Sequence, residues 1–499
     1  MSLVFVCILG YVVLQLAFGF LVARSVHSEE DYLLAGRSLG PALVTFSVFA
    51  TWFGAETCIG ATGKVFREGL SGASADPFGY SLCIIFMGAF FAATFYARRY
   101  TTLADLFRER FGVAAERFAV VLLVPTSVLW AGAQIRAFGQ ILSGASELQV
   151  EVAITVAALI VIVYTSLGGM LADAWSDFAQ GLILILGLLA LSVSYFWFAE
   201  GTGSLAAVPT ERLGVFAGDQ PWLVTAEAWA VPVLGSLFSQ ELIARVLSAR
   251  SVSVARWGTL SGAAVYILVG LMPVLLGLCA AQHLGAVHED KVLLTLAEAY
   301  LPTVLYVIFA GALVSAILST VDTALLVSGS LLAHNLLIPL SSGEAVESSA
   351  VEVDAEEARK LWLNRACVVG AGLVAFGLAL SSESVHELVQ TASGFGSAGI
   401  VVAVLFGLYT RFGGPRACHA SLAVGLAIYV WFAFLEAHFK AAPAGGEPEA
   451  FPYPFLASLA GALAIYLMVG LFETVEEPVA DPSGAAADES ADATPVPTA

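Results

Sequence analysis

Long apolar segments alternate with short polar connections along this chain. About 13 runs of roughly 20 apolar residues are long enough for a helix to cross a bilayer. They lie near residues 2–23, 43–62, 77–97, 118–141, 151–168, 175–198, 228–247, 260–282, 301–336, 364–381, 386–409, 417–438 and 455–473. The pattern predicts an all-α polytopic membrane protein. The first run has no basic leader and no small-residue cleavage site, so we expect it to be retained as a helix.

The composition excludes a soluble protein, and the absence of certain motifs limits the possible classes of function. Hydrophobic residues make up 59% of the chain and charged residues 12%, and the mean hydropathy is +0.87; no soluble domain of this length has such values. The six cysteines are scattered without a CxxC pair, which indicates small buried side chains and no disulfide or metal framework. Neither a GxxxxGK[ST] loop nor an HExxH motif is present. We therefore expect transport driven by an ion gradient, and no enzyme.

The basic residues predict how the chain lies in the membrane. With the N-terminus outside, fifteen Lys and Arg residues, Arg245 among them, fall on the cytoplasmic side and five fall outside. Cytoplasmic loops carry the excess of Lys and Arg, so the count predicts an N-out, C-in chain with an odd number of spans. Arg136 is set apart because it lies inside a predicted span.

Much of the net charge of −19 lies in two segments, residues 344–357 and 473–492. Both are predicted to be solvated and disordered on the cytoplasmic side. The predicted organisation is a single transmembrane transporter domain over residues 1–473, followed by an acidic disordered cytoplasmic tail over residues 474–499. The tail is either inert or an interaction segment.

Two adjacent hydroxyls stand out in the apolar run AGALVSAILSTVDTALLVSGS, residues 310–330. Ser319 and Thr320 lie at mid-depth, and Asp322 follows. Lipid solvates neither hydroxyls nor carboxylates, so such groups face a protein interior or a water-filled path, where they can bind an ion. The alternative is that each hydroxyl bonds back to the carbonyl four residues earlier.

A series of segments resembles one transporter family. DYLLAGRSLGP (31–41), ATWFGAETCIGATGKVFREGL (50–70), GGMLADAWSDFAQGLILILG (168–187), RVLSARSVSVAR (245–256) and ILSTVDTALL (317–326) are similar, in this order, to motifs of the sodium:solute symporter family. The resemblance implies an inverted five-plus-five helix repeat, with core repeats at about 43–198 and 228–409. It also implies alternating access around a midplane site beside a broken helix.

The same resemblance implies a sodium site. Its ligands are expected to be the carbonyls of Ala50, Phe53 and Ala316 and the hydroxyls of Ser319 and Thr320. The residues of the second span agree with a broken helix, because three glycines and several polar residues between positions 51 and 63 make a poor continuous membrane helix. An unwound middle frees carbonyl oxygens, which suit a small hard cation.

Within the family, the second, third and fourth spans are most similar to the choline-transporter branch, through ATWFGAE, DPFGYSLCIIFMGAFFA (76–92) and SVLWAGAQIRAFG (127–139). That branch is expected to surround a quaternary ammonium with aromatic rings, because a ring face attracts a cation. Trp52, Tyr80 and Trp130 fall on the matching positions. Packing of the rings in the protein core is the alternative.

The chain departs from that branch at the expected substrate site. Ser239 stands where the choline branch has a further Trp. Glu56, Glu241 and Arg136 are ionisable residues inside predicted spans, where a charge in the bilayer is energetically unfavourable. An ion pair from Arg136 to either glutamate could simply hold helices together. Alternatively, a carboxylate takes an ammonium or a proton while Arg136 binds a substrate carboxylate.

The sequence therefore predicts a sodium-coupled symporter of a small polar organic solute: a choline-like organic cation, a betaine or an amino acid. A transporter-like sensor and a proton-coupled carrier are the alternatives. The expected partners are the small-molecule substrate, sodium as coupling ion and the lipid of a plasma or inner membrane. No other cofactor and no nucleic acid is expected.

Overall fold

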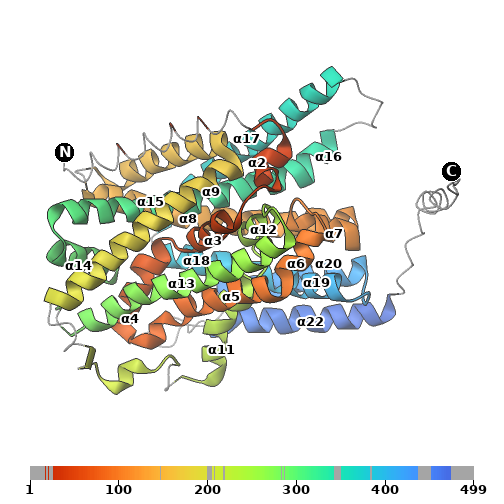
Figure 1. Cartoon of the computed structure of the whole chain (residues 1–499). Coiled ribbons are helices and arrows are strands. Elements are labelled where there is room, and N and C mark those ends of the chain that lie inside the picture. Colours follow the sequence, from red (N-terminus) through yellow and green to blue (C-terminus); the bar gives the residue numbers. More distant parts are fainter. Residues whose placement is uncertain are drawn as a thin grey trace, which may run out of the picture.

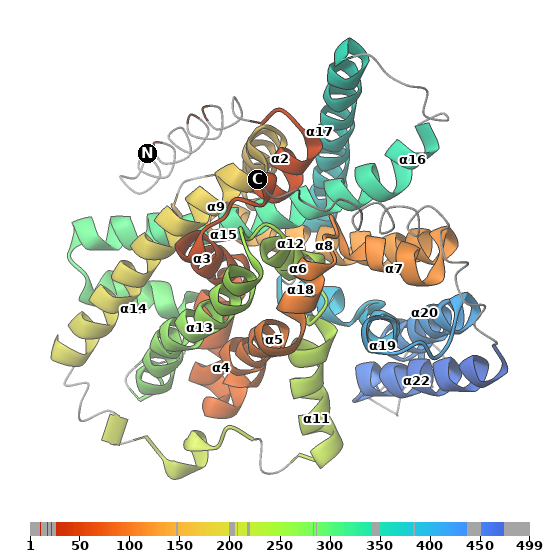
Figure 2. The same cartoon turned by 45° about the vertical axis from the view of Figure 1, so that its right-hand side comes forward.

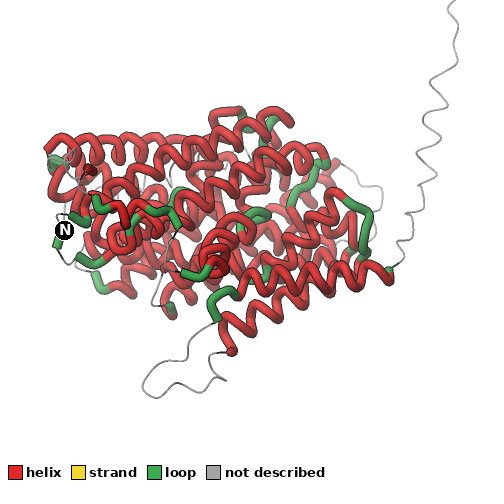
Figure 3. Tube along the Cα trace, turned by 90° about the horizontal axis from the view of Figure 1, so that it is seen from below, coloured by secondary structure: helices red, strands yellow, loops and turns green. Residues whose placement is uncertain are grey.

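The regular structure of the described residues is helical (Figures 1 and 3). The computed structural model describes residues 10, 17, 21, 26–145, 148–198, 205–206, 208–216, 220–282, 284–285, 287–341, 350–382, 385–436 and 451–473. The α-helices are α2 (Glu29–Leu34), α3 (Pro41–Trp52), α4 (Ala61–Glu68), α5 (Tyr80–Phe86), α6 (Ala92–Ala97), α7 (Leu103–Phe111), α8 (Val113–Ala145), α9 (Val150–Phe198), α11 (Trp222–Ala230), α12 (Gln240–Leu247), α13 (Val252–Ala280), α14 (Val292–Tyr300), α15 (Thr303–Leu332), α16 (Ile338–Ser341), α17 (Ala350–Ser381), α18 (Val385–Gly394), α19 (Ser397–Tyr409), α20 (Pro415–Val430) and α22 (Pro454–Phe472).

Ten helices of the described residues are long and apolar enough to span a membrane, and a bent helix pair makes an eleventh. The predicted span near 2–23 lies outside the described residues apart from positions 10, 17 and 21. The predicted spans 151–168 and 175–198 are both contained in α9, which is broken at Gly169 (φ 62°, ψ −174°). An unbroken helix of that length would extend about 70 Å, more than twice the hydrocarbon thickness, so the break separates two spans. Both the count of 13 and the orientation remain predictions.

Gly169 is required at this break for two reasons. Its positive φ is strained for residues with a side chain, and a Cβ there would lie 2.8 Å from Cδ2 of Tyr32. The Tyr32 hydroxyl donates to the Thr165 carbonyl at 3.2 Å, one turn before the break. Tyr32 on α2 therefore packs directly against the point where α9 changes direction.

The second predicted span, 43–62, is broken as expected. α3 starts with Pro41 at its first position, which suits the fixed φ of proline, and it ends at Trp52. A π-helical turn (Glu56–Gly60) and α4 continue the span at an angle of 60°. A Cβ at Gly54 would lie 3.1 Å from Thr320 Oγ1 and from Gln134 Oε1. The absence of a side chain at Gly54 thus lets the break approach α15.

The seventh predicted span, 228–247, is confirmed as part of the candidate span Trp222–Leu247, but its helix is interrupted. α11 passes into a π-helical turn (Val231–Gly235), and α12 starts only at Gln240. Ser239 has extended backbone (φ −63°, ψ 138°), and its hydroxyl accepts the Leu242 N–H at 3.5 Å. A serine that caps a helix start in this way makes a second helix favourable after the break.

The eleventh predicted span, 386–409, is interrupted as well, at Gly396 (φ 69°) between α18 and α19. As at Gly169, the glycine adopts a left-handed backbone conformation that few other residues tolerate. The predicted span is confirmed over Thr391–Tyr409, and it consists of two helices in place of one.

The broken second and seventh spans are joined at one face of the bundle. The Leu39 N–H donates to the Ser248 carbonyl at 3.1 Å, and the Arg250 N–H donates to the Leu39 carbonyl at 3.0 Å. The start of α3 and the end of α12 therefore lie together. These broken spans are the second and the seventh in the predicted order, five spans apart, which is the spacing that an inverted five-plus-five repeat requires.

Burial separates central from peripheral helices. The buried share of the most apolar 18-residue segment is 78% in Trp222–Leu247 and 72% in Thr303–Leu340. It is 28% in Pro415–Leu435. α20 and α22 pack side by side at one edge of the bundle (Figures 1 and 2). α12 and α15 therefore form part of the centre, and α20 and α22 form part of the lipid-facing edge.

The prediction of disorder over 344–357 was wrong for its second half. α17 starts at Ala350. The Glu357 carboxylate accepts the Glu29 N–H at 3.0 Å, a contact that joins this end of α17 to α2, and it accepts the Lys360 ammonium of its own helix at 2.9 Å. Residues 342–349 and the predicted tail, 474–499, lie outside the described residues.

Glu473, the first residue of the predicted acidic segment, caps α20. Its carboxylate accepts the N–H groups of Gly414, Arg416 and Ala417 at 2.9 to 3.0 Å. Partial burial raises the pKa of Glu473, but these three N–H groups and the Arg416 charge outweigh that effect, and its pKa lies below the usual value.

A carboxyl whose pKa is lowered by folding stabilises the protein above its unfolded pKa, about 4.3, and this contribution is lost as the pH falls through the folded pKa. We expect Glu473→Gln to lower the unfolding temperature at pH 7. The difference from wild type should shrink as the pH is lowered from 6 to 3.5. Thermal unfolding of the detergent-solubilised chain measures both, and a difference that grows at low pH would contradict the assignment.

Candidate functional site

The break in the second span lies against α15. The Thr320 hydroxyl is 3.5 Å from the Ala50 carbonyl and 3.1 Å from the Ala316 carbonyl. Phe53 is the residue at which α3 ends (φ −84°, ψ 71°), next to the Gly54 that approaches Thr320. The structure therefore brings three of the five expected sodium ligands into contact, and it places the fourth at the same break.

Ser319 has a different environment. Its hydroxyl donates to the Asp177 carboxylate on α9, so the simple bond back to its own helix does not describe it. Thr320 does make that bond, to Ala316. The two adjacent hydroxyls thus face different groups: Thr320 faces the helix break, and Ser319 faces a buried carboxylate.

The three predicted cage residues are in mutual contact. The ring centroids of Trp52 and Tyr80 are 5.0 Å apart, those of Trp52 and Trp130 are 5.7 Å apart, and those of Tyr80 and Trp130 are 6.3 Å apart. The Tyr80 hydroxyl lies 3.3 Å from the Ser393 hydroxyl. Aromatic groups from three separate elements therefore form one cluster beside the break.

A partly open cavity adjoins this cluster; the empty space between its lining atoms, open solvent included, is about 650 Å³. Its lining includes Trp52 and Trp130, Thr320 of the expected ion site, and Ser239 and Glu241 from the second broken span. The cavity therefore lies between the two breaks and adjoins the ion site.

Three predicted substrate residues take other positions. Tyr80, Glu56 and Arg136 are not among the described residues that line the cavity. The Arg136 guanidinium donates to the Ala379 carbonyl on α17 at 2.9 Å. The prediction that Arg136 would bind a substrate carboxylate thus finds no geometric support, whereas Glu241 keeps its place at the cavity.

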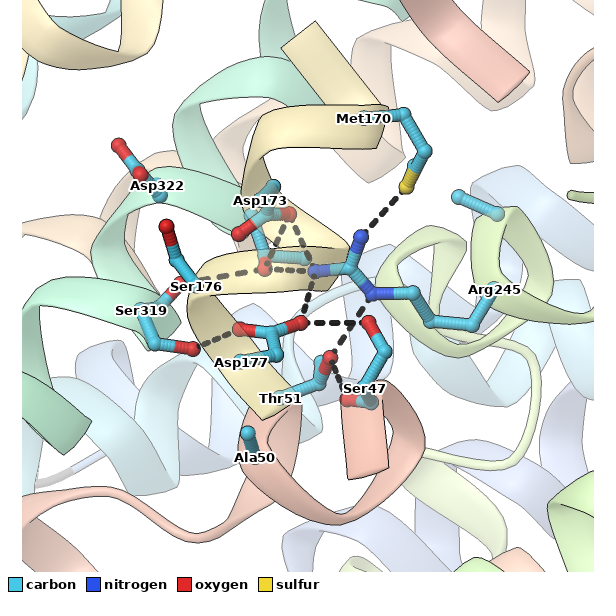
Figure 4. A network of polar contacts seen from close by, with 12 residues as sticks. Ser47, Ala50, Thr51, Met170, Asp173, Ser176, Asp177, Arg245, Ser319 and Asp322 are labelled. Carbon is cyan, nitrogen blue, oxygen red and sulfur yellow. Dashed lines mark hydrogen bonds and ion pairs between the residues drawn. The ribbon is translucent and has the colours of Figure 1, made fainter. Parts of the chain in front are cut away.

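A buried charged network lies beside the ion site (Figure 4). Arg245 of α12 is fully buried, and its guanidinium forms ion pairs with Asp173 and, at 3.2 Å, with Asp177. It also donates to the Thr51 hydroxyl at 3.0 Å. The placement of Arg245 in a cytoplasmic loop was wrong, because two carboxylates compensate its charge inside the bundle. Without Arg245, the predicted distribution of Lys and Arg is fourteen on the cytoplasmic side against five outside.

The carboxylates connect this network to the ion site. Asp177 accepts hydroxyl groups from Ser47 and Ser319, and Asp173 accepts the Thr323 hydroxyl at 3.1 Å. Since the side chains come from α3, α9, α12 and α15, the network joins both predicted repeats. Through Asp173 and Asp177, α15 is thereby connected to Arg245 of α12.

The network contains more negative than positive groups. Asp322, on α15, accepts the Thr165 hydroxyl and is buried like Asp173 and Asp177. Two aspartates thus pair with the guanidinium of Arg245, and Asp322 lies nearby (Figure 4). Buried charges are stable only when they are paired and hydrogen-bonded. The stability of this region is therefore expected to depend on Arg245.

Sequence reasoning assigned no role to Asp173, Asp177 or Arg245. A signal was present: two acids four residues apart lie on one face of an otherwise apolar helix, and intramembrane acids are functional candidates by default. The partner on α12 is about 70 residues away, and no local pattern identifies it.

Comparison with known proteins agrees with this architecture. The sequence profile of the Sodium:solute symporter family matches residues 32–413. The High-affinity choline transporter 1 of Drosophila melanogaster is 28% identical over 381 residues, which cover 73% of this chain and 59% of that protein. The High-affinity proline transporter PutP of Bacillus subtilis is 24% identical over 443 residues, covering 84% of this chain and 89% of PutP.

Among solved structures, a Na⁺-coupled sialic acid symporter in its substrate-bound outward-open state has the same fold. The TM-score is 0.78 at 14% identity, and the match covers 95% of this chain and 98% of that one. At this identity the likeness concerns the fold, and it extends over nearly the whole chain.

Proposed function

Because this chain belongs to the sodium:solute symporter family and is a multi-pass membrane protein, we propose that it is a sodium-coupled symporter of a small organic cation. It works by alternating access around the cavity between its two broken spans. The observation that carries this proposal is the shared position of Thr320, which faces the break at Ala50 and also lines the cavity beside Trp52 and Trp130.

The proposed sodium ligands are the carbonyls of Ala50, Phe53 and Ala316 and the hydroxyls of Ser319 and Thr320. Oxygen ligands suit a small hard cation. A sodium ion held there would fix α15 against the break in the second span, and Trp52 at that break lines the cavity. Ion binding would thus order the substrate site, which is the coupling that symport requires.

The substrate class follows from the groups at the cavity. Trp52 and Trp130 present ring faces that attract a cation, and Glu241 supplies a negative charge. Choline is a cation of this class, and a choline transporter is among the relatives. The proline relative makes a zwitterion the competing substrate, but Arg136 bonds to α17 away from the cavity lining. An organic cation is therefore the better fit.

Uptake of labelled choline, glycine betaine and proline into proteoliposomes, each with and without an inward sodium gradient, tests this proposal. We expect the gradient to drive accumulation of the cation. Accumulation of a zwitterion alone would contradict the substrate class, and accumulation of none of the three would contradict the proposed transport of such solutes.

The aromatic wall gives a second prediction. We expect Trp130→Phe to weaken uptake less than Trp130→Ala, because the smaller ring keeps part of the cation attraction, which is worth about 0.5 to 2 kcal/mol. The half-saturating concentration of the labelled cation is the measurement. Trp257, exposed on α13 away from the cavity lining, offers Trp257→Ala as a matched control. Equal uptake by wild type and both Trp130 variants would leave Trp130 with a packing role only.

A further inference from the structure

The cavity carries a charge that a purely aromatic cage does not have. Among its described lining residues, Glu241 is the one acidic or basic side chain, and no Lys, Arg or His accompanies it. Arg245, one turn further along α12, is already surrounded by Asp173 and Asp177. The negative charge at Glu241 is therefore available for a positively charged ligand.

Part of the acceptor capacity of Glu241 is also unused by the protein groups described. Its carboxylate accepts hydrogen bonds from the Ser127 side chain of α8 and from its own backbone N–H, whereas an ionised carboxylate can accept about four. A quaternary ammonium has no N–H to donate, so it would leave those acceptors unsatisfied in a confined site. A primary or secondary ammonium would satisfy them with charge-assisted hydrogen bonds, which are about twice as strong as neutral ones.

Two other groups point to the same kind of ligand. Ser239 occupies a lining position without an aromatic ring, and its hydroxyl already caps α12 by accepting the Leu242 N–H. The Trp52 indole N–H is buried without a hydrogen-bond acceptor among the described groups, and Trp52 lines the cavity. A ligand oxygen near the ammonium would provide that acceptor.

From these contacts we propose that the pocket selects a small organic cation with N–H groups and a neighbouring oxygen, such as an amino alcohol, over its quaternary counterpart. Glu241 is the counter-ion, and Trp52 Nε1 binds the oxygen. This selectivity rests on the proposed function, since it concerns the same transport site. A site built to hydrogen-bond a ligand discriminates strongly against an analogue without the donor.

A methylation series tests the selectivity. The series is ethanolamine, N-methylethanolamine, N,N-dimethylethanolamine and choline. Its members differ only in the number of methyl groups on the nitrogen, and each added methyl group removes one N–H. We expect the half-saturating concentration for sodium-driven uptake by the full chain in proteoliposomes to rise along the series, by about tenfold or more from ethanolamine to choline. Protein-free liposomes correct for passive entry. A flat or reversed series would overturn the proposal.

Variants assign the selectivity to its residues. Glu241→Gln keeps the shape of the side chain and removes its charge. It should therefore weaken ethanolamine uptake more than choline uptake and reduce the differences in half-saturating concentration among the four compounds. The double variant Ser239→Trp with Glu241→Val replaces the charge by an aromatic wall and should shift the preference toward choline. Glu109→Gln, in an exposed ion pair with Arg98, is the control and should leave the series unchanged.

The outcomes separate this selectivity from the proposed function. Sodium-driven uptake of choline without uptake of ethanolamine would overturn the selectivity and leave symport intact. If no member of the series moves with any sodium gradient, both fail. If Glu241→Gln keeps the whole series but abolishes the pH dependence of uptake, Glu241 carries a proton instead of facing the ammonium, and the proposal is overturned.

Discussion

Replacing both Ser319 and Thr320 by Ala raises the sodium concentration for half-maximal uptake by about tenfold or more. Each hydroxyl supplies one expected ion ligand, and each lost ligand costs on the order of 1 kcal/mol. Thr320→Ala alone should change the sodium requirement without breaking a hydrogen bond to another described side chain, because the Thr320 hydroxyl bonds to the Ala50 and Ala316 carbonyls. Ser319→Ala also removes a hydrogen bond to Asp177 and should in addition lower stability.

Sodium binding can also be followed without a substrate. A ligand that binds the folded state raises the unfolding temperature, so wild type should be stabilised by NaCl relative to KCl at equal ionic strength, and the double variant should lose that difference. Ser328→Ala is the matched control, because this buried hydroxyl on α15 bonds only back to the Ala324 carbonyl. An unchanged response of the double variant to sodium would remove both residues from the ion site.

Arg245→Met is expected to be the most damaging single substitution in the transport core. It leaves the buried aspartates Asp173 and Asp177 without their guanidinium, and removal of one partner from a buried ion pair costs about 3 to 5 kcal/mol. Thermal unfolding of the detergent-solubilised protein is the measurement. Arg250→Met, an exposed arginine five residues further along the chain, is the control and should be close to wild type.

A second substitution keeps this prediction testable if Arg245→Met hardly folds. Asp173→Asn removes one of the excess negative charges, so it should destabilise wild type yet partly rescue the protein in the Arg245→Met background. Such non-additivity is the signature of groups that interact directly. Equal stability of Arg245→Met and Arg250→Met, or strict additivity of Arg245→Met and Asp173→Asn, would contradict the network.

The spans could be predicted because length and mean hydropathy are local properties. The break after Trp52 was also predictable, since glycines and polar residues interrupt that run. The break before Gln240 was missed, although Pro232, Gly235 and the polar residues from Ser236 to Glu241 interrupt the run 228–247 too. The span has the lowest mean hydropathy of the ten candidate spans among the described residues, 1.3. The resemblance to a family supplied the pairing of α3 with α15, which no local pattern contains.

The positions of charged groups were the least predictable part of the site. Arg245 directly precedes a loop in sequence, yet its burial depends on aspartates that α9 brings to it. Glu241 and Arg136 were equal candidates in the sequence. The rotation of each helix places Glu241 at the cavity and turns Arg136 to α17, and helix rotation is set by packing over the whole bundle.

Coupling between the two solutes is the central claim, and movement of labelled sodium tests it most directly. Proteoliposomes with equal sodium on both sides receive an inward gradient of ethanolamine or choline, and entry of labelled sodium is followed for wild type and for the Ser319→Ala, Thr320→Ala double variant. We predict that the organic cation gradient draws sodium into vesicles with wild type and does not do so with the variant. Entry of the organic cation without sodium in wild-type vesicles would contradict the account.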